Sequence, residues 1–169
     1  LSRFDSEHSE LKLSRFPFVE AVKDIYNAVY MEAQKHNHTL TLAAEPGLPE
    51  VMADRERVIQ VMMNIVSNSI KYTPDGGHIA IRAGRAGGKV WMEVDDNGIG
   101  IPEEDRPRIF ERFYRVDKAR SRQSGGTGLG LSIAKEIMER HQGRIALLDK
   151  DGPGLLVRLE LNIEGPGNG

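Results

Sequence analysis

Apolar residues recur with the period of a helix in two long segments, residues 18–37 and 55–73. In the first segment the spacing predicts an amphipathic helix. Its apolar positions are Phe18, Val22, Ile25, Tyr26, Val29 and Ala33. Asp54 stands directly before the second segment and is the predicted N-cap of a helix that ends near Thr73.

The second helix is apolar around most of its circumference and polar along one stripe. At about 100° per residue, the polar side chains fall within roughly 80° of the helical wheel. They are Gln60, Asn64, Asn68 and Lys71. A helix this apolar is expected to be buried, and buried polar groups need partners. Either the asparagines bond to neighbouring backbone, or an anionic ligand with a metal ion satisfies the amides and the lysine together.

Alternating and short apolar runs predict the strands. The expected strands are residues 39–44, 78–83, 89–95, 144–148 and 155–162, and further helices are expected at 103–113 and 129–142. Residues 1–15 are predicted to be the tail of a helix followed by a short extended piece, and the glycine-rich end at 165–169 should fray.

Composition limits the class of protein. With 169 residues, 39% of them hydrophobic and 28% charged, the chain suits one globular domain. A net charge of −2 argues against a general nucleic-acid or membrane surface. The chain has no cysteine, which excludes disulfides and cysteine-bound metals.

A loop that combines an acidic residue with glycines follows the strand at 89–95. Asp96 precedes Gly98 and Gly100, and glycines at this spacing let the backbone approach a flat ligand closely. Asp96 could then accept a hydrogen bond from a donor such as an exocyclic amine. A calcium loop is disfavoured because Ile99 stands where a third oxygen ligand is required. A plain turn remains the alternative.

Two further segments suggest an anion site. Residues 114–124 carry four basic residues and almost nothing to bury, which predicts a mobile loop, either a lid or an ordinary solvated loop. Residues 125–132 are rich in glycine and open a helix, where exposed amides bind anions. Leu131 replaces the third glycine of the dinucleotide fingerprint, so that motif is excluded. His141 is expected to be a helix-end side chain rather than a ligand.

These motifs occur in one order, and together they resemble the catalytic ATP-binding domain of bacterial sensor histidine kinases. Residues 64–72 resemble the asparagine box of that family, 96–100 its first glycine box, 110–113 its phenylalanine box and 126–131 its second glycine box. The resemblance implies a two-layer α/β sandwich, with a mixed, mainly antiparallel sheet covered on one face by helices and a flexible ATP lid.

The resemblance also implies roles for single residues. Asp96 would bind the adenine amine, and Gly98 and Gly100 would let the base settle. Asn68 would hold Mg²⁺ with Asn64 close by, as magnesium takes few protein ligands besides phosphates and water. The implied catalytic residues are Asn64, Asn68 and Lys71. Lys71 would contact a phosphate group of the nucleotide. The other implied nucleotide contacts are Tyr72, Ile101, Arg115, Gly126, Thr127, Gly128, Leu129, Gly130 and Leu131.

Three departures from the wider family refine this expectation. ATP-hydrolysing members carry Glu where this chain has Asn64, and an asparagine cannot accept the proton of water. None of the five histidines has the context of the family's phosphoacceptor. The usual Gly-Thr pair near 154–156 is replaced by Gly-Leu-Leu, which weakens a packing detail.

The expected function is therefore to bind Mg-ATP and donate the γ-phosphate to a histidine on a separate dimerisation domain, for relay to a response regulator. A non-catalytic ATP-binding interaction module is the alternative. Residues 13–163 would form the kinase domain, 1–12 the end of the dimerisation helix and its linker, and 164–169 a frayed tail. The intact kinase is expected to be a membrane-anchored homodimer, and this part a cytoplasmic monomer that binds no nucleic acid.

Overall fold

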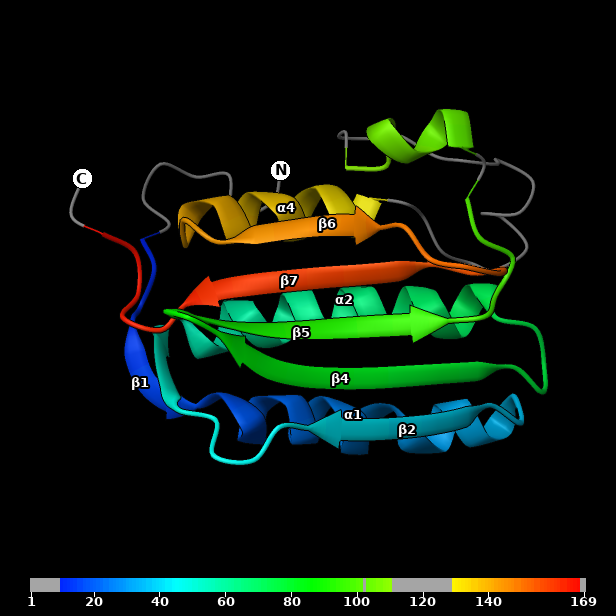
Figure 1. Ribbon diagram of the computed structural model, residues 1–169, viewed down its shortest axis with the longest axis horizontal. Coiled ribbons are helices and arrows are strands. Elements are labelled where there is room, and N and C mark those ends of the chain that lie inside the picture. Colours follow the sequence, from blue (N-terminus) through cyan, green and yellow to red (C-terminus); the bar gives the residue numbers. More distant parts are fainter. Residues whose placement is uncertain (1–9, 102, 111–128, 168–169) are drawn as a thin grey trace.

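The residues that the structure describes form two layers, a five-stranded sheet and a layer of three helices (Figure 1). The structure is a computed structural model that describes residues 10–101, 103–110 and 129–167. The helices are α1 (Phe18–Lys35), α2 (Arg55–Tyr72) and α4 (Leu129–Arg140), and a 3-10 helix, η2, spans Glu103–Arg108. The strands of the main sheet are β2 (Thr39–Ala44), β4 (His78–Ala86), β5 (Lys89–Asp96), β6 (Arg144–Leu148) and β7 (Leu156–Asn162).

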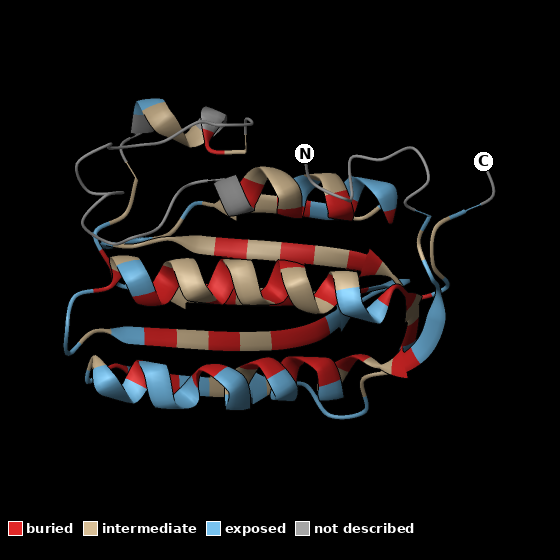
Figure 2. Cartoon of the chain, turned by 180° about the vertical axis from the view of Figure 1, so that it is seen from behind, coloured by how far each residue is buried: buried red, intermediate tan, exposed pale blue. Residues whose placement is uncertain are grey.

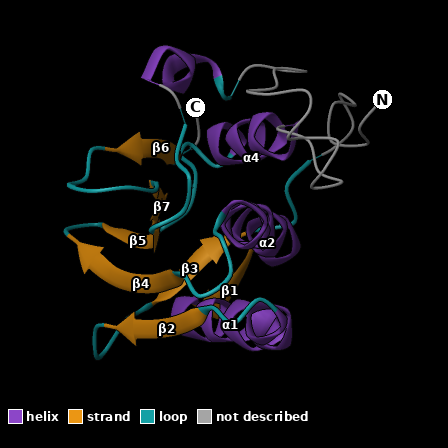
Figure 3. Cartoon of the chain, turned by 90° about the vertical axis from the view of Figure 1, so that its right-hand side faces the viewer, coloured by secondary structure: helices purple, strands orange, loops and turns teal. Residues whose placement is uncertain are grey.

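The sheet has the order β2-β4-β5-β7-β6. Only the β2–β4 pair is parallel, and the other three pairs are antiparallel. Viewed from behind, α2 lies between α1 and α4 (Figure 2), and all three helices cover the same face of the sheet (Figure 3). The predicted mixed, mainly antiparallel α/β sandwich is confirmed.

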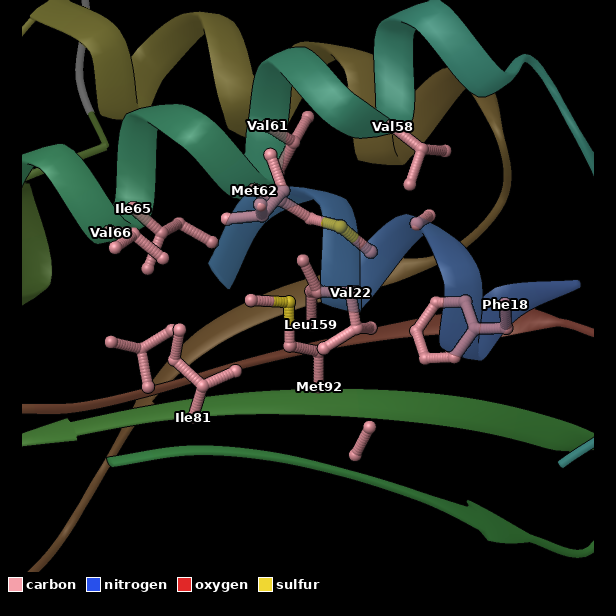
Figure 4. Close-up of a cluster of buried hydrophobic side chains, with 14 of the residues drawn as sticks. Phe18, Val22, Val58, Val61, Met62, Ile65, Val66, Ile81, Met92 and Leu159 are labelled. Atoms are coloured by element: carbon pink, nitrogen blue, oxygen red, sulfur yellow. The ribbon is translucent and has the colours of Figure 1, made fainter. Parts of the chain in front are cut away.

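The core fills the space between the two layers (Figure 4). Side chains from α1 and α2 meet side chains from the central strands, and each is at most 3% exposed. Among them are Val22, Val61, Met62, Ile65, Ile81, Met92 and Leu159. Because burial of one such side chain stabilises a fold by about 1.5–3 kcal/mol, this layer fixes α2 against the sheet.

A two-stranded sheet beside the main one was not predicted. It pairs β1 (Ser14–Pro17) with β3 (Glu50–Ala53) in antiparallel register. Met52 also donates its backbone N–H to the carbonyl of Ile163, over 2.9 Å. Strands of four residues give almost no periodic signal, and both partners of β3 are distant in sequence.

Other differences concern element ends. The helix expected at 103–113 is a 3-10 helix that ends at Arg108, and β4 extends to Ala86. The helices α1 and α4 end before Asn37 and Gln142, which take positive φ angles of 56° and 57°. Past β7, Gly167 donates its N–H to Gln142 Oε1, over 2.8 Å.

The face of the sheet opposite the helices carries charges that alternate in sign. Arg82 on β4 lies 3.4 Å from Glu93 on β5, and Glu93 lies 2.8 Å from Arg158 on β7. Arg158 also contacts Glu160 at 2.9 Å and covers the ring of Trp91 at 4.7 Å. Within the described ranges, no helix is long and apolar enough to cross a membrane.

Candidate functional site

The motifs singled out in the sequence meet at one end of the domain. The C-terminal ends of α2 and β5 lie toward the right-hand end of Figure 1, and α4 begins at its own right-hand end in the same view. A backbone hydrogen bond of 3.1 Å from Ile99 to the carbonyl of Tyr72 joins the loop after β5 to the end of α2. The asparagine box and the first glycine box are therefore neighbours.

The polar stripe of α2 faces away from the core, as predicted. Asn64 and Asn68 are partly exposed and Lys71 is exposed, whereas Val61, Ile65 and the rest of the apolar side are buried. Gln60, the fourth member of the stripe, accepts a hydrogen bond of 3.1 Å from Arg57. Neither Asn68 nor Lys71 forms a side-chain hydrogen bond or ion pair with a residue that the structure describes.

Asp96 is the centre of the site because three donors hold its buried carboxylate. Its Oδ1 accepts the N–H of Gly98 at 2.9 Å and that of Leu155 at 3.2 Å. Its Oδ2 accepts the hydroxyl of Ser69 on α2 at 2.7 Å. Asp96 is 5% exposed and Ser69 6%. The carboxylate is thereby fixed between the end of β5, the β6–β7 loop and α2.

Gly98 is required at its position by close packing. A Cβ there would stand 2.5 Å from the carbonyl oxygen of Tyr72 and 2.9 Å from the hydroxyl oxygen of Thr73. Real Cβ atoms do not approach other atoms so closely, so a side chain would separate the loop from α2. The sequence analysis expected the backbone here to approach a ligand closely, and the structure shows a close approach to the end of α2.

Gly154 presses against the other side of Asp96. It has a φ of +102°, and a Cβ there would stand 1.8 Å from the Asp96 carbonyl oxygen. Gly100, with a φ of +73°, lies against Gly154 in turn. Leu155 contributes its backbone N–H to Asp96. Because the backbone makes this contact, Leu in place of the family's Thr leaves it intact.

Asp95, next to the site, belongs to an ion pair on the open face of the sheet. Lys150 Nζ lies 2.6 Å from Asp95 Oδ1 and also donates to the Asp96 carbonyl at 2.6 Å. Burial raises the pKa of Asp95, but the hydrogen bonds from Lys150 and Arg82 outweigh it and hold that pKa below its ordinary value. Lys150 therefore connects the charged face to the site.

Thr73, directly after α2, carries a buried hydroxyl without a partner among the described residues. Its side chain is next to Gly98, and its carbonyl lies 2.8 Å from His38 Nε2. The Thr73 hydroxyl, buried between the end of α2 and the loop after β5, can therefore still donate one hydrogen bond.

Ile101 lies beside a different set of residues. It borders a cleft of about 470 Å³ whose other lining residues are Arg106, Asp149 and Lys150. The second glycine box is described only from Leu129, where α4 begins, and Leu131 is buried. Outside the described residues lie Arg115, Gly126, Thr127 and Gly128, together with the proposed lid at 114–124 and residues 111–113 of the phenylalanine box.

His141 has a structural role, as expected for a helix-end side chain. It is 1% exposed, its Nδ1 lies 2.9 Å from the Ile137 carbonyl, and its Nε2 accepts the N–H of Asp54 at 3.0 Å. Desolvation by burial lowers its pKa, although the hydrogen bond to Ile137 and the charge of Asp54 act in the opposite direction. A neutral ring therefore joins the end of α4 to the start of α2.

The oxygen atoms at the site are compatible with a Mg²⁺ ion that is coordinated mainly by the phosphates of a bound ligand and by water. No group of three or more acidic, histidine or cysteine side chains that could hold a metal occurs in the ranges described. The carboxamides of Asn64 and Asn68 lie one helical turn apart on α2. Magnesium is usually bound by one or two protein oxygens, with phosphates and water completing its coordination, so these residues fit the ion.

Sequence reasoning missed three contributors to the site, namely Ser69, Gly154 and Lys150. For Ser69 a signal exists, because it is a hydroxyl on the otherwise apolar side of α2 and must find a partner when buried. Gly154 and Lys150 act from a loop 54 or more residues away from Asp95 and Asp96. No local pattern announces such contacts.

Comparison with known proteins agrees with this geometry. Residues 53–165 match the family model described as histidine kinase-, DNA gyrase B-, and HSP90-like ATPase. The sensor histidine kinase WalK of Bacillus subtilis is 37% identical over 163 residues, which cover 95% of this chain and 26% of WalK. The sensor-like histidine kinase SenX3 of Mycolicibacterium smegmatis is 38% identical over 153 residues, which cover 87% of this chain and 40% of SenX3.

A solved catalytic domain has the same fold over nearly its whole length. The nucleotide-free catalytic domain of histidine kinase ThkA matches with a TM-score of 0.81 at 29% identity, covering 91% of this chain and 97% of that one. This chain spans only about a quarter of WalK, so its likeness concerns one part of that protein. The chain belongs to the family of histidine kinase-, DNA gyrase B- and HSP90-like ATPases, and it has the fold of a histidine kinase catalytic domain.

Proposed function

We propose that this chain binds Mg-ATP and donates the γ-phosphate to a histidine on a separate dimerisation domain. The observation that carries the proposal is the fixed, buried carboxylate of Asp96 beside the end of the polar stripe of α2. Asp96 offers an acceptor for the adenine amine, and the stripe offers amides and an ammonium group for the phosphates. Tyr72, partly buried at the end of α2, would line the base pocket.

Positioning and charge neutralisation would be the main contributions to catalysis, as in phosphoryl transfer generally. Asn68 and Asn64 would hold the magnesium ion, which neutralises negative charge on the phosphates. Lys71 would contact a phosphate from the last turn of α2. Arg115 and residues 126–131 are proposed to close over the phosphates.

Asn64 favours transfer over hydrolysis. A carboxamide cannot take the proton from an attacking water, whereas the Glu of the hydrolysing relatives can. The γ-phosphate would therefore remain available for a histidine. This is the reason to prefer the kinase branch of the family for this chain.

The partners follow from the same role. A solved structure shows histidine kinase ThkA in complex with the response regulator protein TrrA. We infer that the intact protein is a homodimer that passes its phosphate to a response regulator, with residues 1–12 leading to the dimerisation helix and 164–169 as a tail. The catalytic part would work as a monomeric unit in the cytoplasm, near a membrane-anchored sensor, without nucleic acid.

The decisive experiment is transfer of labelled γ-phosphate to a supplied dimerisation domain that carries the acceptor histidine. We expect the chain to label that domain and the Asn68→Ala variant to lose labelling, with Asn27→Ala, an exposed asparagine on α1, as the matched control. ATP binding without transfer would favour the interaction module. Phosphate released by the chain alone would favour a hydrolase.

A further inference from the structure

Among the residues that the structure describes, the hydrogen bonds of Asp96 leave room for a single additional donor. An ionised carboxylate has about four lone-pair positions and only accepts hydrogen bonds. Both positions of Oδ1 are used by the N–H groups of Gly98 and Leu155. One position of Oδ2 is used by Ser69, which leaves one.

Ser69 determines which position remains. It lies on the buried side of α2 between Ile65 and Ile70, and its hydroxyl lies 2.7 Å from Oδ2. A hydroxyl there can be satisfied only by a protein group or an enclosed water. Since the backbone donors hold Oδ1 from the loops, Ser69 is the contact that fixes Oδ2 from the helix.

We propose that Ser69 is a positioning residue that makes the site selective for a 6-amino purine. Its hydroxyl holds the Asp96 carboxylate so that the one free lone pair of Oδ2 accepts an amine. This inference rests on the proposed ATP site and adds the residue that tunes it. A 6-oxo purine would present an acceptor to an acceptor and gain no hydrogen bond.

Removing the hydroxyl should affect only ligands that carry the amine. Without Ser69 Oγ, Oδ2 has two unused positions and the carboxylate loses its constraint from α2. The bond to the ligand amine then forms in poorer geometry or in competition with water. A purine that has hydrogen in place of the amine makes no such bond, so its affinity should not depend on Ser69.

The test compares two ligands on three proteins by calorimetry. The ligands are ATP and purine riboside 5′-triphosphate, which lacks the amine. For Ser69→Ala we expect ATP to bind about tenfold more weakly, as for loss of a hydrogen bond to a charged group, and the analogue to bind as it does to the unchanged chain. Ser67→Ala, a neighbouring serine on the same helix, is the matched control and should bind both ligands normally.

The outcomes separate this inference from the proposed function. If Ser69→Ala keeps the full preference for ATP, or loses affinity for both ligands equally, the positioning role is wrong although the ATP site stands. If the unchanged chain binds neither ligand, both are wrong. Ser69→Thr keeps a hydroxyl on the same carbon and should therefore keep the preference for ATP over the analogue. If Ser69→Thr lost this preference, the inference would also be contradicted.

Discussion

The site depends on backbone groups that approach one another too closely for side chains. Gly98 lies against the last carbonyl of α2, and Gly154 lies against the backbone of Asp96. Both contacts bring an N–H of the loop within reach of the Asp96 carboxylate. The two glycines thus let backbone N–H groups hold Oδ1 of Asp96, while the Ser69 hydroxyl holds Oδ2.

Gly154→Ala should be strongly destabilising. The substitution combines a φ of +102° with a Cβ placed 1.8 Å from a carbonyl oxygen, so we expect a loss of about 2–4 kcal/mol in the free energy of unfolding. Gly152→Ala is the control, because its φ is +84° but its surroundings are open. It should cost about 1–2 kcal/mol from backbone strain alone. Equal losses in urea unfolding would show that close packing at Gly154 is unimportant.

At this scale the sequence identified the acidic residue and the glycines that follow it, because they lie within five positions. It did not identify Ser69 or Gly154 as their partners. Ser69 contacts Asp96 across 27 positions, and Leu155 reaches it across 59. Such contacts arise from the way strands and helices assemble, which a local pattern does not record.

Elements were predictable where their own sequence has a clear period. The helices α1 and α2 and the strand β5 have strong periods of three to four or of two residues, and each was placed to within two residues. Short β3 was missed, since it exists through its pairing with β1 and its bond to Ile163. The ends of α1 and α4 were set by single residues with positive φ angles.

His141 connects two of these elements and should make stability depend on pH. Its pKa is lowered in the folded state, from an ordinary value of 6.5. As pH falls below that value, the unfolded chain takes up a proton that the folded chain does not, so stability is present above about pH 6.5 and is lost below it. Between pH 7.5 and 5.5 this histidine should therefore contribute a loss of stability.

Urea unfolding of His141→Gln at the two pH values tests this contribution. The variant should be less stable at both, but its loss between pH 7.5 and 5.5 should be smaller than that of the unchanged chain. His78→Gln, which alters an exposed histidine, should leave the pH dependence as it was. A His141→Gln variant with an unaltered pH dependence would rule out the buried neutral ring as its source.

For the whole molecule, ligand binding should appear as thermal stability. A ligand that binds only the folded state stabilises it by about 2.7 kcal/mol at 100 times its Kd, which raises Tm by roughly 5–10 °C in a domain of this size. We expect this shift with Mg-ATP in a thermal melt, and little shift with Mg²⁺ alone. Asp96→Asn should reduce the shift at the same ATP concentration, because an amide donor would face the adenine amine. An equal shift in that variant would remove Asp96 from the base site.

The family of the molecule was predictable because its motifs occur in a fixed order along the chain. The assignment rested on four short segments spread over residues 64–131, and the fold and the family match confirm it. The proposed magnesium ion, acceptor histidine and response regulator would each lie partly or wholly outside this polypeptide, so its own sequence carries little signal for them.

The charges on the open face of the sheet bear on how the chain finds its strand alignment during folding. A shift of β5 by one residue would turn Glu93 into the apolar core, which the alternation of side chains forbids. A shift by two in one direction keeps the faces but places the uncharged Trp91 where Glu93 now stands opposite both Arg82 and Arg158. A shift by two in the other direction places Glu93 opposite Glu160, which brings like charges together. Like hydrophobic alternation, alternating charge therefore rejects misaligned sheets, and it does so for the shifts that hydrophobicity alone would accept.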